Sequence, residues 1–540
     1  MPLMLPLEDY VAQVLAALTP LKPVEVPLAR AHGLVLAEDV TAAVPVPPWT
    51  NSAMDGYALR AQDAASACPQ APVALPVAGD VPAGAEPAPL APGTAQRIMT
   101  GAMLPPGADA VVKVEDTDQA PGPRPLPARI RILAAPTVGL NVRRRAEDVA
   151  IGDPVLGAGT VLGAAAVSAL ASVGRGTVRA IPRVRVAVVS TGAELIDAGS
   201  EPAAGTIPDS NGLLLAGLSR EHGAEPVSVT RSGDTTAELT RVLTAAACHA
   251  DLVVTSGGVS AGAFDPLKML GAAPRRQDGP AAPTGPAAPG GGGGREAPHA
   301  GGPEESEEEE AGADLRLDFA KVAMQPGKPQ GHGWVRDRAG RRVPLIALPG
   351  NPVSVLVSFT TIVAPALARL SGHDGTAVGR TRPGRVGTAL PVRARAAVPW
   401  RTSPGRRQHI PVRLVPAPQD PGPGAGAQDA SGELWVAPSH RLGSGSHLVA
   451  SLPGAQALAV VDARIERVEV GDEVALVALS HPAAPGAALP LEEPVSQPSP
   501  PAPRAAAGRR PSLRPGAGGA PAPPGPGAAG DSVPPARKES

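Results

Sequence analysis

Residues 186–195 read VAVVSTGAEL, and this stretch decides the fold. Val186–Val189 is a continuous apolar run, which is typical of a strand that is covered on both faces. The following segments alternate between helix and strand: a helix over 209–223, a strand over 226–230, a helix over 235–247, and strands over 251–255 and 345–348. This alternation predicts a parallel sheet with covering helices.

Other patterns flank this core. A helix is expected over residues 7–20, and short β-type runs over 40–150 predict a compact β-rich module. The uncharged stretch 155–174 predicts a turn and a short buried helix that ends at Gly174. Residues 376–480 predict a small all-β domain, which is interrupted by the Pro/Gly-rich stretch 416–429. Two further segments, 273–313 and 482–540, are rich in Pro, Gly and Ala, and are predicted to be disordered.

Composition narrows the class of protein. A chain of 540 residues is too long for one core, so several domains are expected. The formal net charge of −2 argues against a general nucleic-acid binder. Cys68 and Cys248 are the only cysteines, which excludes a disulfide framework and fits a reducing compartment. Neither a signal peptide nor a membrane span is visible, so we expect a soluble cytoplasmic protein.

Three loops follow expected strands of the sheet: Ser190–Glu194, Ser256–Gly262 with the nearby Asp265, and Pro349–Ser354. Ligands of open α/β sheets bind beyond the carboxyl ends of the strands. Glycine lets backbone N–H groups approach an anion, and carboxylates such as Glu194 and Asp265 suit magnesium. The loops predict a site for a phosphorylated ligand, although each one alone could be only a tight turn. The patterns GxxxxGK[ST] and GxGxxG do not follow a strand.

The N-terminal half has its own candidates. Asp55 lies in the turn-like stretch Asn51–Tyr57, where Asp-Gly also suits a plain hairpin turn. Thr100 stands beside a glycine after a β-type run. Arg143–Arg145 could grip an oxyanion or simply form a solvated charged face. Further cations come from Lys321 and from Lys328 in the turn Gln-Pro-Gly-Lys-Pro. Because no nucleophile elbow or Ser-His-Asp order is present, acyl transfer is not expected.

Together these motifs carry a resemblance. In chain order they read PPWTNSAMDGYAL, RIMTGAMLPPGADAVVKVEDT, NVRRRAEDV, VAVVSTGAEL, IPDSN, DLVVTSGGVSAG, KVAMQPGKPQG and LPGNPVS. This series resembles the molybdopterin molybdenumtransferases, the MoeA family, which includes the E domain of gephyrin. The similarity spans roughly residues 5–480 apart from the insertions. The middle portion is also similar to the smaller MogA-type adenylyltransferases.

The resemblance implies a multidomain α/β plus β protein. Its expected parts are a split N-terminal linker domain (1–49 and 148–181), a β-rich module (50–147), a MogA-like α/β sandwich domain (182–375), a C-terminal β-barrel (376–480) and a tail (481–540). It also implies an elongated homodimer, whose active cleft lies between the α/β domain of one subunit and the N-terminal module of the other.

The resemblance further implies the site residues. Those expected to be catalytic are Asp55, Thr100, Asp148, Glu194 and Asp265. Those expected to hold magnesium are Glu194, Asp234 and Asp265. Those expected to bind substrate are Arg143, Arg144, Ser190, Thr191, Gly192, Asp209, Ser256, Gly257, Gly258, Ser260, Gly262, Lys321, Lys328, Pro349, Gly350, Asn351 and Ser354. The chain departs from the family at Gly233, where an acidic pair is reduced to Asp234, and at Gln325, where some members have Lys.

The activity implied is insertion of molybdate into adenylylated molybdopterin, with release of AMP and with magnesium as the cofactor. A molybdopterin adenylyltransferase and molybdoenzymes are candidate partners, whereas nucleic acids and membranes are not. Two alternatives stay open at this point. One is adenylyl transfer from ATP to molybdopterin, as in MogA-like proteins, and the other is a scaffold that binds protein partners.

Overall fold

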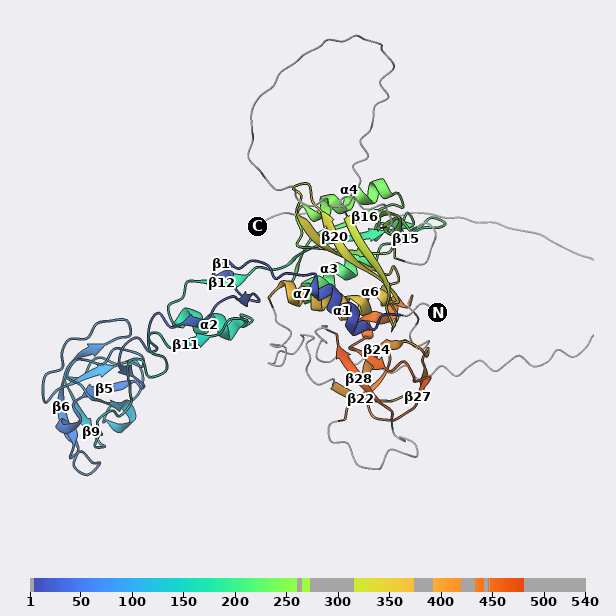
Figure 1. The fold of residues 1–540 in the computed structure, drawn as a ribbon. Coiled ribbons are helices and arrows are strands. Elements are labelled where there is room, and N and C mark those ends of the chain that lie inside the picture. Colours follow the sequence, from blue (N-terminus) through green and yellow to red (C-terminus); the bar gives the residue numbers. More distant parts are fainter. Residues whose placement is uncertain are drawn as a thin grey trace, which may run out of the picture. The chain divides into compact units, whose positions relative to one another are not determined.

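The computed structural model of the chain describes residues 4–259, 265–271, 315–372, 392–418, 433–440, 445 and 447–479. The chain divides into two units, Met1–Ala483 and Ala484–Ser540, and every element below belongs to the first (Figure 1). The insertion 273–313 and the tail 481–540, both predicted to be disordered, lie outside the described residues, as do Ser260 and Gly262.

A six-stranded sheet forms the centre of the α/β domain, in the order β16-β13-β17-β21-β20-β18. The strands are β16 (Glu225–Ser232), β13 (Arg185–Thr191), β17 (Leu252–Ser256), β21 (Arg342–Leu348), β20 (Pro329–Arg336) and β18 (Leu315–Lys321). The first four pair in parallel, as predicted. The prediction omitted β20 and β18, which continue the sheet with antiparallel pairing.

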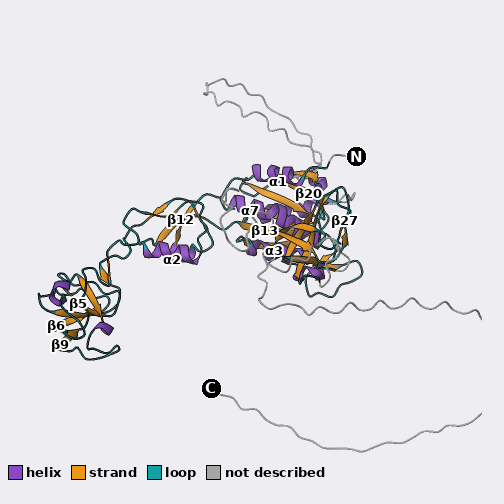
Figure 2. Ribbon diagram, turned by 90° about the horizontal axis from the view of Figure 1, so that it is seen from below, coloured by secondary structure: helices purple, strands orange, loops and turns teal. Residues whose placement is uncertain are grey.

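Helices cover both faces of this sheet (Figures 1 and 2). They are α1 (Leu7–Ala16), α3 (Asn211–Glu221), α4 (Thr236–Ala247), α5 (Pro266–Gly271), α6 (Pro352–Ser358) and α7 (Ala364–Leu370). Alternate residues of β13 point into two different cores: Val186 and Val188 into one, Ala187 and Val189 into the other. The apolar run VAVV therefore has the two covered faces that the sequence predicted.

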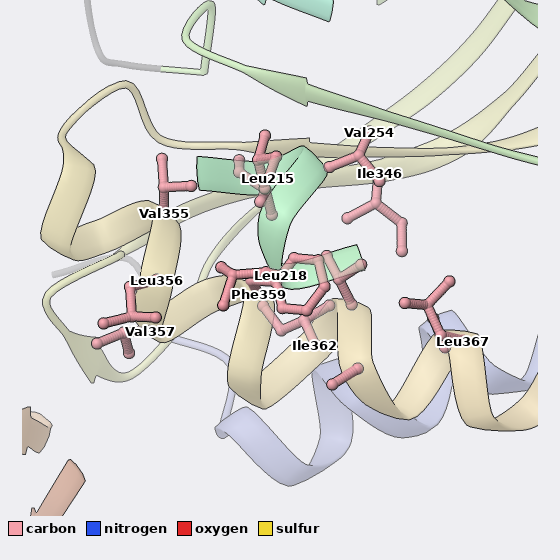
Figure 3. Packing of buried hydrophobic residues seen from close by; sticks show 14 of the residues in the cluster. Leu215, Leu218, Val254, Ile346, Val355, Leu356, Val357, Phe359, Ile362 and Leu367 are labelled. Carbon is pink, nitrogen blue, oxygen red and sulfur yellow. The ribbon is translucent and has the colours of Figure 1, made fainter. Parts of the chain in front are cut away.

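The larger core gathers around the helical stretch Pro352–Leu370 (Figure 3). Within it, α6 and α7 are joined by the π-helical segment Phe359–Val363. Phe359 and Ile362 are fully buried, together with Leu215 of α3. Among the described residues, this stretch is the one helix long and apolar enough to cross a membrane, and 78% of it is buried inside the protein. Its apolar character is explained by its place in the core.

The ends of the α/β helices are fixed by the residue types that the sequence indicated. An Asp209 carboxylate oxygen accepts the N–H of Gly212 at 2.9 Å at the start of α3. The Thr235 hydroxyl accepts the N–H of Glu238 at 3.3 Å at the start of α4. Gly223, with a φ of +78°, follows the end of α3. Side-chain acceptors thus satisfy N–H groups that have no partner inside a helix.

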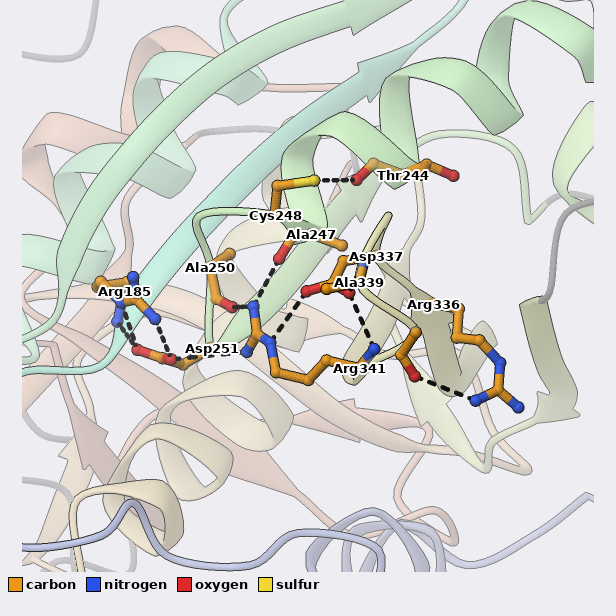
Figure 4. Close-up of polar contacts among 11 residues, drawn as sticks. Arg185, Thr244, Ala247, Cys248, Ala250, Asp251, Arg336, Asp337, Ala339 and Arg341 are labelled. Atoms are coloured by element: carbon orange, nitrogen blue, oxygen red, sulfur yellow. Dashed lines mark hydrogen bonds and ion pairs between the residues drawn. The ribbon is translucent and has the colours of Figure 1, made fainter.

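Arginines and aspartates form an ionic network at the amino ends of the parallel strands (Figure 4). The Asp251 carboxylate accepts from the backbone N–H of Arg185 at 3.0 Å and from its guanidinium at 2.8 and 3.0 Å. Arg341 donates to the carboxylate of Asp337 at 3.1 Å and to the carbonyls of Ala247 and Ala250. This network links the starts of β13, β17 and β21.

The β-rich module is a five-stranded sheet in the order β8-β5-β7-β6-β9. Its strands are β8 (Ala110–Lys113), β5 (Gly56–Leu59), β7 (Ala95–Ile98), β6 (Val73–Val81) and β9 (Arg129–Ile132). A short antiparallel pair, β4 (Asn51–Ser52) with β10 (Val142–Arg143), belongs to the same region. The predicted β-rich module is therefore present.

Residues before and after this module pair with each other, as a split linker domain requires. The strands are β1 (Val24–Pro27), β12 (Thr177–Ile181) and β2 (Val35–Leu36) in one sheet, and β3 (Val40–Thr41) with β11 (Pro154–Leu156) in another. The helix predicted within 155–174 is α2 (Ala164–Ser172). The prediction that it is buried is wrong, because Leu170 is its one buried residue. Its composition of alanines did not reveal which side faces the core.

The C-terminal region closes into a β-barrel, as predicted. Its strands are β22 (Val392–Ala396), β24 (Arg407–Val415), β25 (Trp435–Pro438), β26 (Ala457–Val461) and β28 (Glu473–Ala478). They pair in the order β24-β25-β22-β28-β26, and β26 pairs back with β24. Strand β19 (Met324–Gln325) adds to β24 in parallel, although it comes from the α/β segment. The exact residue limits predicted for the domains stay a prediction.

Candidate functional site

A cavity of about 860 Å³ lies at the carboxyl ends of β13, β17 and β21. All three predicted loops line it, each with several residues. The lining from these loops is Thr191, Gly192, Glu194, Ser256, Gly257, Gly258, Val259, Asp265, Pro349, Gly350, Asn351, Pro352 and Ser354. Asp209, Asp234 and Lys328 line it as well. The expectation that these loops meet at one edge of the sheet is correct.

Hydrogen bonds hold the three loops to one another. The Thr191 hydroxyl donates to the carbonyl of Ser256 at 3.2 Å, and the N–H of Gly257 donates to the carbonyl of Leu348 at 3.0 Å. The Asn211 amide, at the start of α3, donates to the carbonyl of Gly350 at 2.6 Å. These hydrogen bonds join the described parts of the three loops into one rim.

Two glycines are required by this close packing. Gly257 has a φ of +91°, and a Cβ there would lie 2.6 Å from the backbone oxygen of Thr191. Gly192 has a φ of +148°, and a Cβ there would lie 2.5 Å from a carboxylate oxygen of Glu194. At Gly257 other residues are disfavoured both by the backbone angle and by contact with the Thr191 backbone, whereas at Gly192 the backbone angle decides, because the Glu194 carboxylate is the end of a flexible side chain. Gly257 allows the second loop to approach the backbone of the first. Gly192 allows the Glu194 carboxylate to lie close to the backbone of its own loop.

Charged side chains of both signs line the cavity. The acidic ones are Glu194, Asp209, Asp234 and Asp265, and the basic ones are Lys328, Arg406 and His447. Among the described residues, no three carboxylates, histidines or cysteines come close enough together to hold a metal ion without help. Magnesium commonly uses one or two carboxylates and takes its other ligands from water and substrate phosphates. The predicted ligands Glu194, Asp234 and Asp265 all line the cavity, and one or two of them would be enough for an ion of this kind.

The basic turn and a helix N-terminus provide donors for an anion. Lys328 is half-buried in the turn between β19 and β20, where its carbonyl accepts the N–H of Val322 at 2.8 Å. Ser354, in the first turn of α6, is 3% exposed and lines the cavity. A lysine, a hydroxyl and helix N–H groups together suit a phosphate or another tetrahedral oxyanion.

Two predicted ligands of the α/β domain lie outside the described lining. Lys321 ends β18 with an exposed side chain. Ser190 is fully buried beneath the rim, where its hydroxyl accepts from that of Ser256 at 3.4 Å. We therefore assign Ser190 a supporting place rather than one in contact with a ligand.

The remaining predicted residues lie in or beside the β-rich module, and of these Asp55 and Thr100 contact each other directly. One Asp55 oxygen accepts the N–H of Thr100 at 2.6 Å and its hydroxyl at 2.8 Å. These two hydrogen bonds, the backbone one first, hold the pKa of the Asp55 carboxyl below its ordinary value. Arg143 pairs across β10 and β4 with Asn51, in the stretch that contains Asp55. Asp55, Thr100, Arg143, Arg144 and Asp148 are all absent from the described lining of the cavity.

Sequence reasoning missed several residues of the lining. Asn211 follows the aspartate of IPDSN, so its motif was available as a signal. Arg406, His447 and Val449 come from the barrel region. No local sequence motif marks these residues. They reach the cavity through the contact between the barrel and the α/β domain, which the sequence does not reveal.

Comparisons with known proteins agree with this architecture. Three family models match: the MoeA N-terminal region (domain I and II) over residues 5–174, a probable molybdopterin binding domain over 187–272, and the MoeA C-terminal region (domain IV) over 393–479. "Molybdopterin molybdenumtransferase 2" of Mycobacterium tuberculosis is 42% identical over 353 residues, which cover 65% of this chain and 76% of that protein.

The chain belongs to the MoeA family. "Molybdopterin molybdenumtransferase 1" of Mycobacterium tuberculosis is 32% identical over 88% of this chain and 99% of that protein. The crystal structure of a molybdopterin biosynthesis MoeA protein from Pyrococcus horikoshii superposes with a TM-score of 0.61 and 28% identity, and covers 89% of this chain and all of the other. The likeness to the MoeA family thus includes the regions before and after the α/β domain.

Proposed function

We propose that the chain is a molybdopterin molybdenumtransferase, which inserts molybdate into adenylylated molybdopterin and releases AMP. One observation carries the proposal: in a chain of the MoeA family, three glycine-containing loops, a lysine turn and a helix N-terminus line one cavity of about 860 Å³. That volume is in the range of pockets that enclose a cofactor-sized ligand.

The substrate carries both phosphates and a separate oxyanion. The backbone N–H groups of the loop at Gly257 and Gly258 suit the phosphoanhydride. Molybdate is a tetrahedral dianion, and Lys328 with the Ser354 hydroxyl provides the cation and the hydrogen-bond donor that it needs. Arg406 adds a second cation from the barrel side of the lining. The dithiolene sulfurs come from the pterin, so a chain with two cysteines suffices.

We propose magnesium as the cofactor, with Glu194, Asp234 and Asp265 as the side chains available to it. When bound, the ion would neutralise phosphate charge and polarise the phosphoanhydride. The chain's own residues then supply orientation and charge stabilisation, which are large contributions to catalysis.

Asp55 is proposed to orient the water or oxyanion that attacks the AMP phosphorus. Attack there breaks the phosphoanhydride, so AMP leaves and the terminal phosphate stays on the pterin. Thr100 supports this role, since its two hydrogen bonds keep Asp55 ionised and fix its direction. We propose a cytoplasmic homodimer in which the β-rich module of one copy supplies Asp55 to the cavity of the other.

The test supplies the purified protein with adenylylated molybdopterin, magnesium and molybdate, and measures AMP release together with molybdenum bound to the pterin. Both products are expected from the wild-type chain, and Asp55→Ala is expected to release AMP at least 100-fold more slowly, in line with the loss of one oriented catalytic group. AMP release by Asp55→Ala at the wild-type rate would disprove the role of Asp55. The absence of molybdenum transfer by the wild-type chain would disprove the function.

The adenylyltransferase alternative is tested in parallel with ATP and molybdopterin. We expect no adenylylated product, because the matches to the MoeA N-terminal and C-terminal regions go beyond the molybdopterin binding domain that a MogA-like enzyme requires. Adenylylation at a rate comparable with molybdenum transfer would favour the alternative.

A further inference from the structure

A buried amide ties the lysine turn to the helix that carries Ser354. The Gln330 side chain donates one N–H to the carbonyl of Gly327 at 2.6 Å and the other to the hydroxyl of Ser358 at 2.7 Å. Gln330 and Ser358 are both fully buried, and neither lines the cavity. Both donors of the amide are therefore used inside the protein.

Each end of this connection leads directly to a residue of the lining. Gly327 immediately precedes Lys328 in the turn. Ser358 is four residues after Ser354 in α6, which places the two serines on the same side of the helix, one turn apart. The amide thus joins the backbone beside the cation to the helix that bears the hydroxyl.

The packing around this amide leaves little room for a side chain at Gly327. Gly327 has a φ of +101°, and a Cβ there would lie 2.9 Å from the Ser358 hydroxyl and 3.2 Å from the Gln330 amide nitrogen. A glycine is thus required for the turn to approach the helix this closely. The turn is held by two buried hydrogen bonds and by close contact, at a place where an exposed loop would otherwise move.

We propose that Gln330 is a positioning residue, which sets the separation of Lys328 and Ser354 and thereby the fit of the site for a tetrahedral oxyanion. This inference rests on the proposed function of the cavity and names residues outside its lining that control the oxyanion. Molybdate is small and rigid, so it gains both contacts only when the cation and the hydroxyl are held at a fixed spacing. In the proposed placement the phosphoanhydride lies against the loop at Gly257 and Gly258, so binding of adenylylated molybdopterin should depend less on this spacing.

The test measures the KM for molybdate and the KM for adenylylated molybdopterin separately. Gln330→Leu removes both hydrogen bonds and is expected to raise the KM for molybdate about tenfold, and to leave the other KM within about twofold. Ser358→Ala removes the acceptor with a smaller change and is expected to give the same split. Both variants break the same connection between the turn and the helix. The KM for molybdate of the double variant is therefore expected to rise as much as in one single variant, and not by the product of the two single increases.

Gln96→Leu is the matched control. Gln96 is also buried, 4% exposed, and its amide donates to the carbonyl of Ala88 at 3.1 Å within the β-rich module. We expect it to leave the ratio of the two KM values unchanged. The role of Gln330 would be overturned if Gln330→Leu raised both KM values equally. It would also be overturned if the KM for molybdate of the double variant rose by the product of the two single increases. A wild-type chain that transfers no molybdenum would instead overturn the proposed function.

Discussion

Charged side chains are paired at one end of the parallel strands and line a cavity at the other. At the amino ends, Asp251 and Asp337 are each held by an arginine through several hydrogen bonds (Figure 4). At the carboxyl ends, Glu194, Asp234 and Lys328 line a cavity, and none of them forms an ion pair with another described residue. Charge that is paired internally serves the fold, whereas charge left in a cavity is available to a ligand.

The comparison is tested most strongly by removing one charge at the carboxyl end. Glu194→Gln keeps the shape of the side chain and is expected to lower the rate of AMP release by about 10²–10³-fold, since it removes a preorganised charge. The melting temperature is expected to stay near that of the wild type, because no ion pair is lost.

Glu225→Gln supplies the control for this prediction, since Glu225 begins β16 at the opposite end of the sheet. Its AMP release is expected to equal that of the wild type. Similar losses of activity in both variants would remove the distinction between the two ends.

Gly257→Ala tests whether the cavity rim is also part of the fold. We expect a loss of about 3 kcal/mol in the free energy of unfolding, from the strained φ and from contact with the Thr191 backbone. Gly84→Ala has a similar φ, +83°, but no atom within 4 Å of its added Cβ, so about 1 kcal/mol is expected there. Equal losses, measured by denaturant unfolding, would show that the close contact at Gly257 contributes nothing.

Asp251→Ala tests the amino end. It removes the acceptor of three hydrogen bonds from Arg185, and we expect about 2 kcal/mol less unfolding free energy, a value kept modest because Arg185 is 45% exposed. AMP release at saturating substrate should be unchanged. Asp318→Ala, which breaks an exposed ion pair with Arg316, should cost about 0.5 kcal/mol or less. An Asp251 variant that is stable but inactive would contradict the comparison.

The smallest expected effect concerns pH. The backbone N–H of Arg341, and then its guanidinium and the N–H of Ala339, lower the pKa of Asp337. A carboxyl whose pKa is lower in the folded state contributes stability above its unfolded pKa, about 3.9, and loses it as the pH falls through the folded value. Asp337→Asn should therefore reduce the difference in melting temperature between pH 6 and pH 3. A difference equal to that of the wild type would mean that Asp337 does not contribute to acid sensitivity.

Much of the fold could be predicted because local patterns matched their final surroundings. The run Val186–Val189 predicted a strand with two covered faces, and three loops after strands predicted one ligand edge. Strand β20 was missed because its glycines and polar residues interrupt any alternation, whereas the alternation of Leu315, Leu317 and Phe319 in β18 was a signal that the prediction did not use. Strand β20 pairs with β21, and β18 in turn pairs with β20, so pairing rather than local propensity makes β20 a strand.

The site could be predicted only as far as its motifs reach. Lys328 was found from its turn, but Arg406 and His447 enter the cavity from a region whose position no local signal encodes. Lys321 was expected to line the same cleft as Lys328, but its side chain is exposed at the end of β18 and is absent from the described lining. Gln330 sits directly after the lysine turn, yet its importance depends on contact with a helix 28 residues further along the chain.

Strand β19 belongs to the barrel sheet, although it lies between two strands of the α/β sheet in the chain. The segment that leads into Lys328 is therefore anchored by hydrogen bonds to β24 on the far side of the domain boundary. A chain that ends before residue 392 would keep every strand of the α/β sheet. It would lose the pairing of β19 with β24, which holds one side of the lysine turn. The barrel is therefore needed to hold the lysine turn in place. A chain shortened in this way should bind anions more weakly, even if the loops after β13, β17 and β21 keep their arrangement.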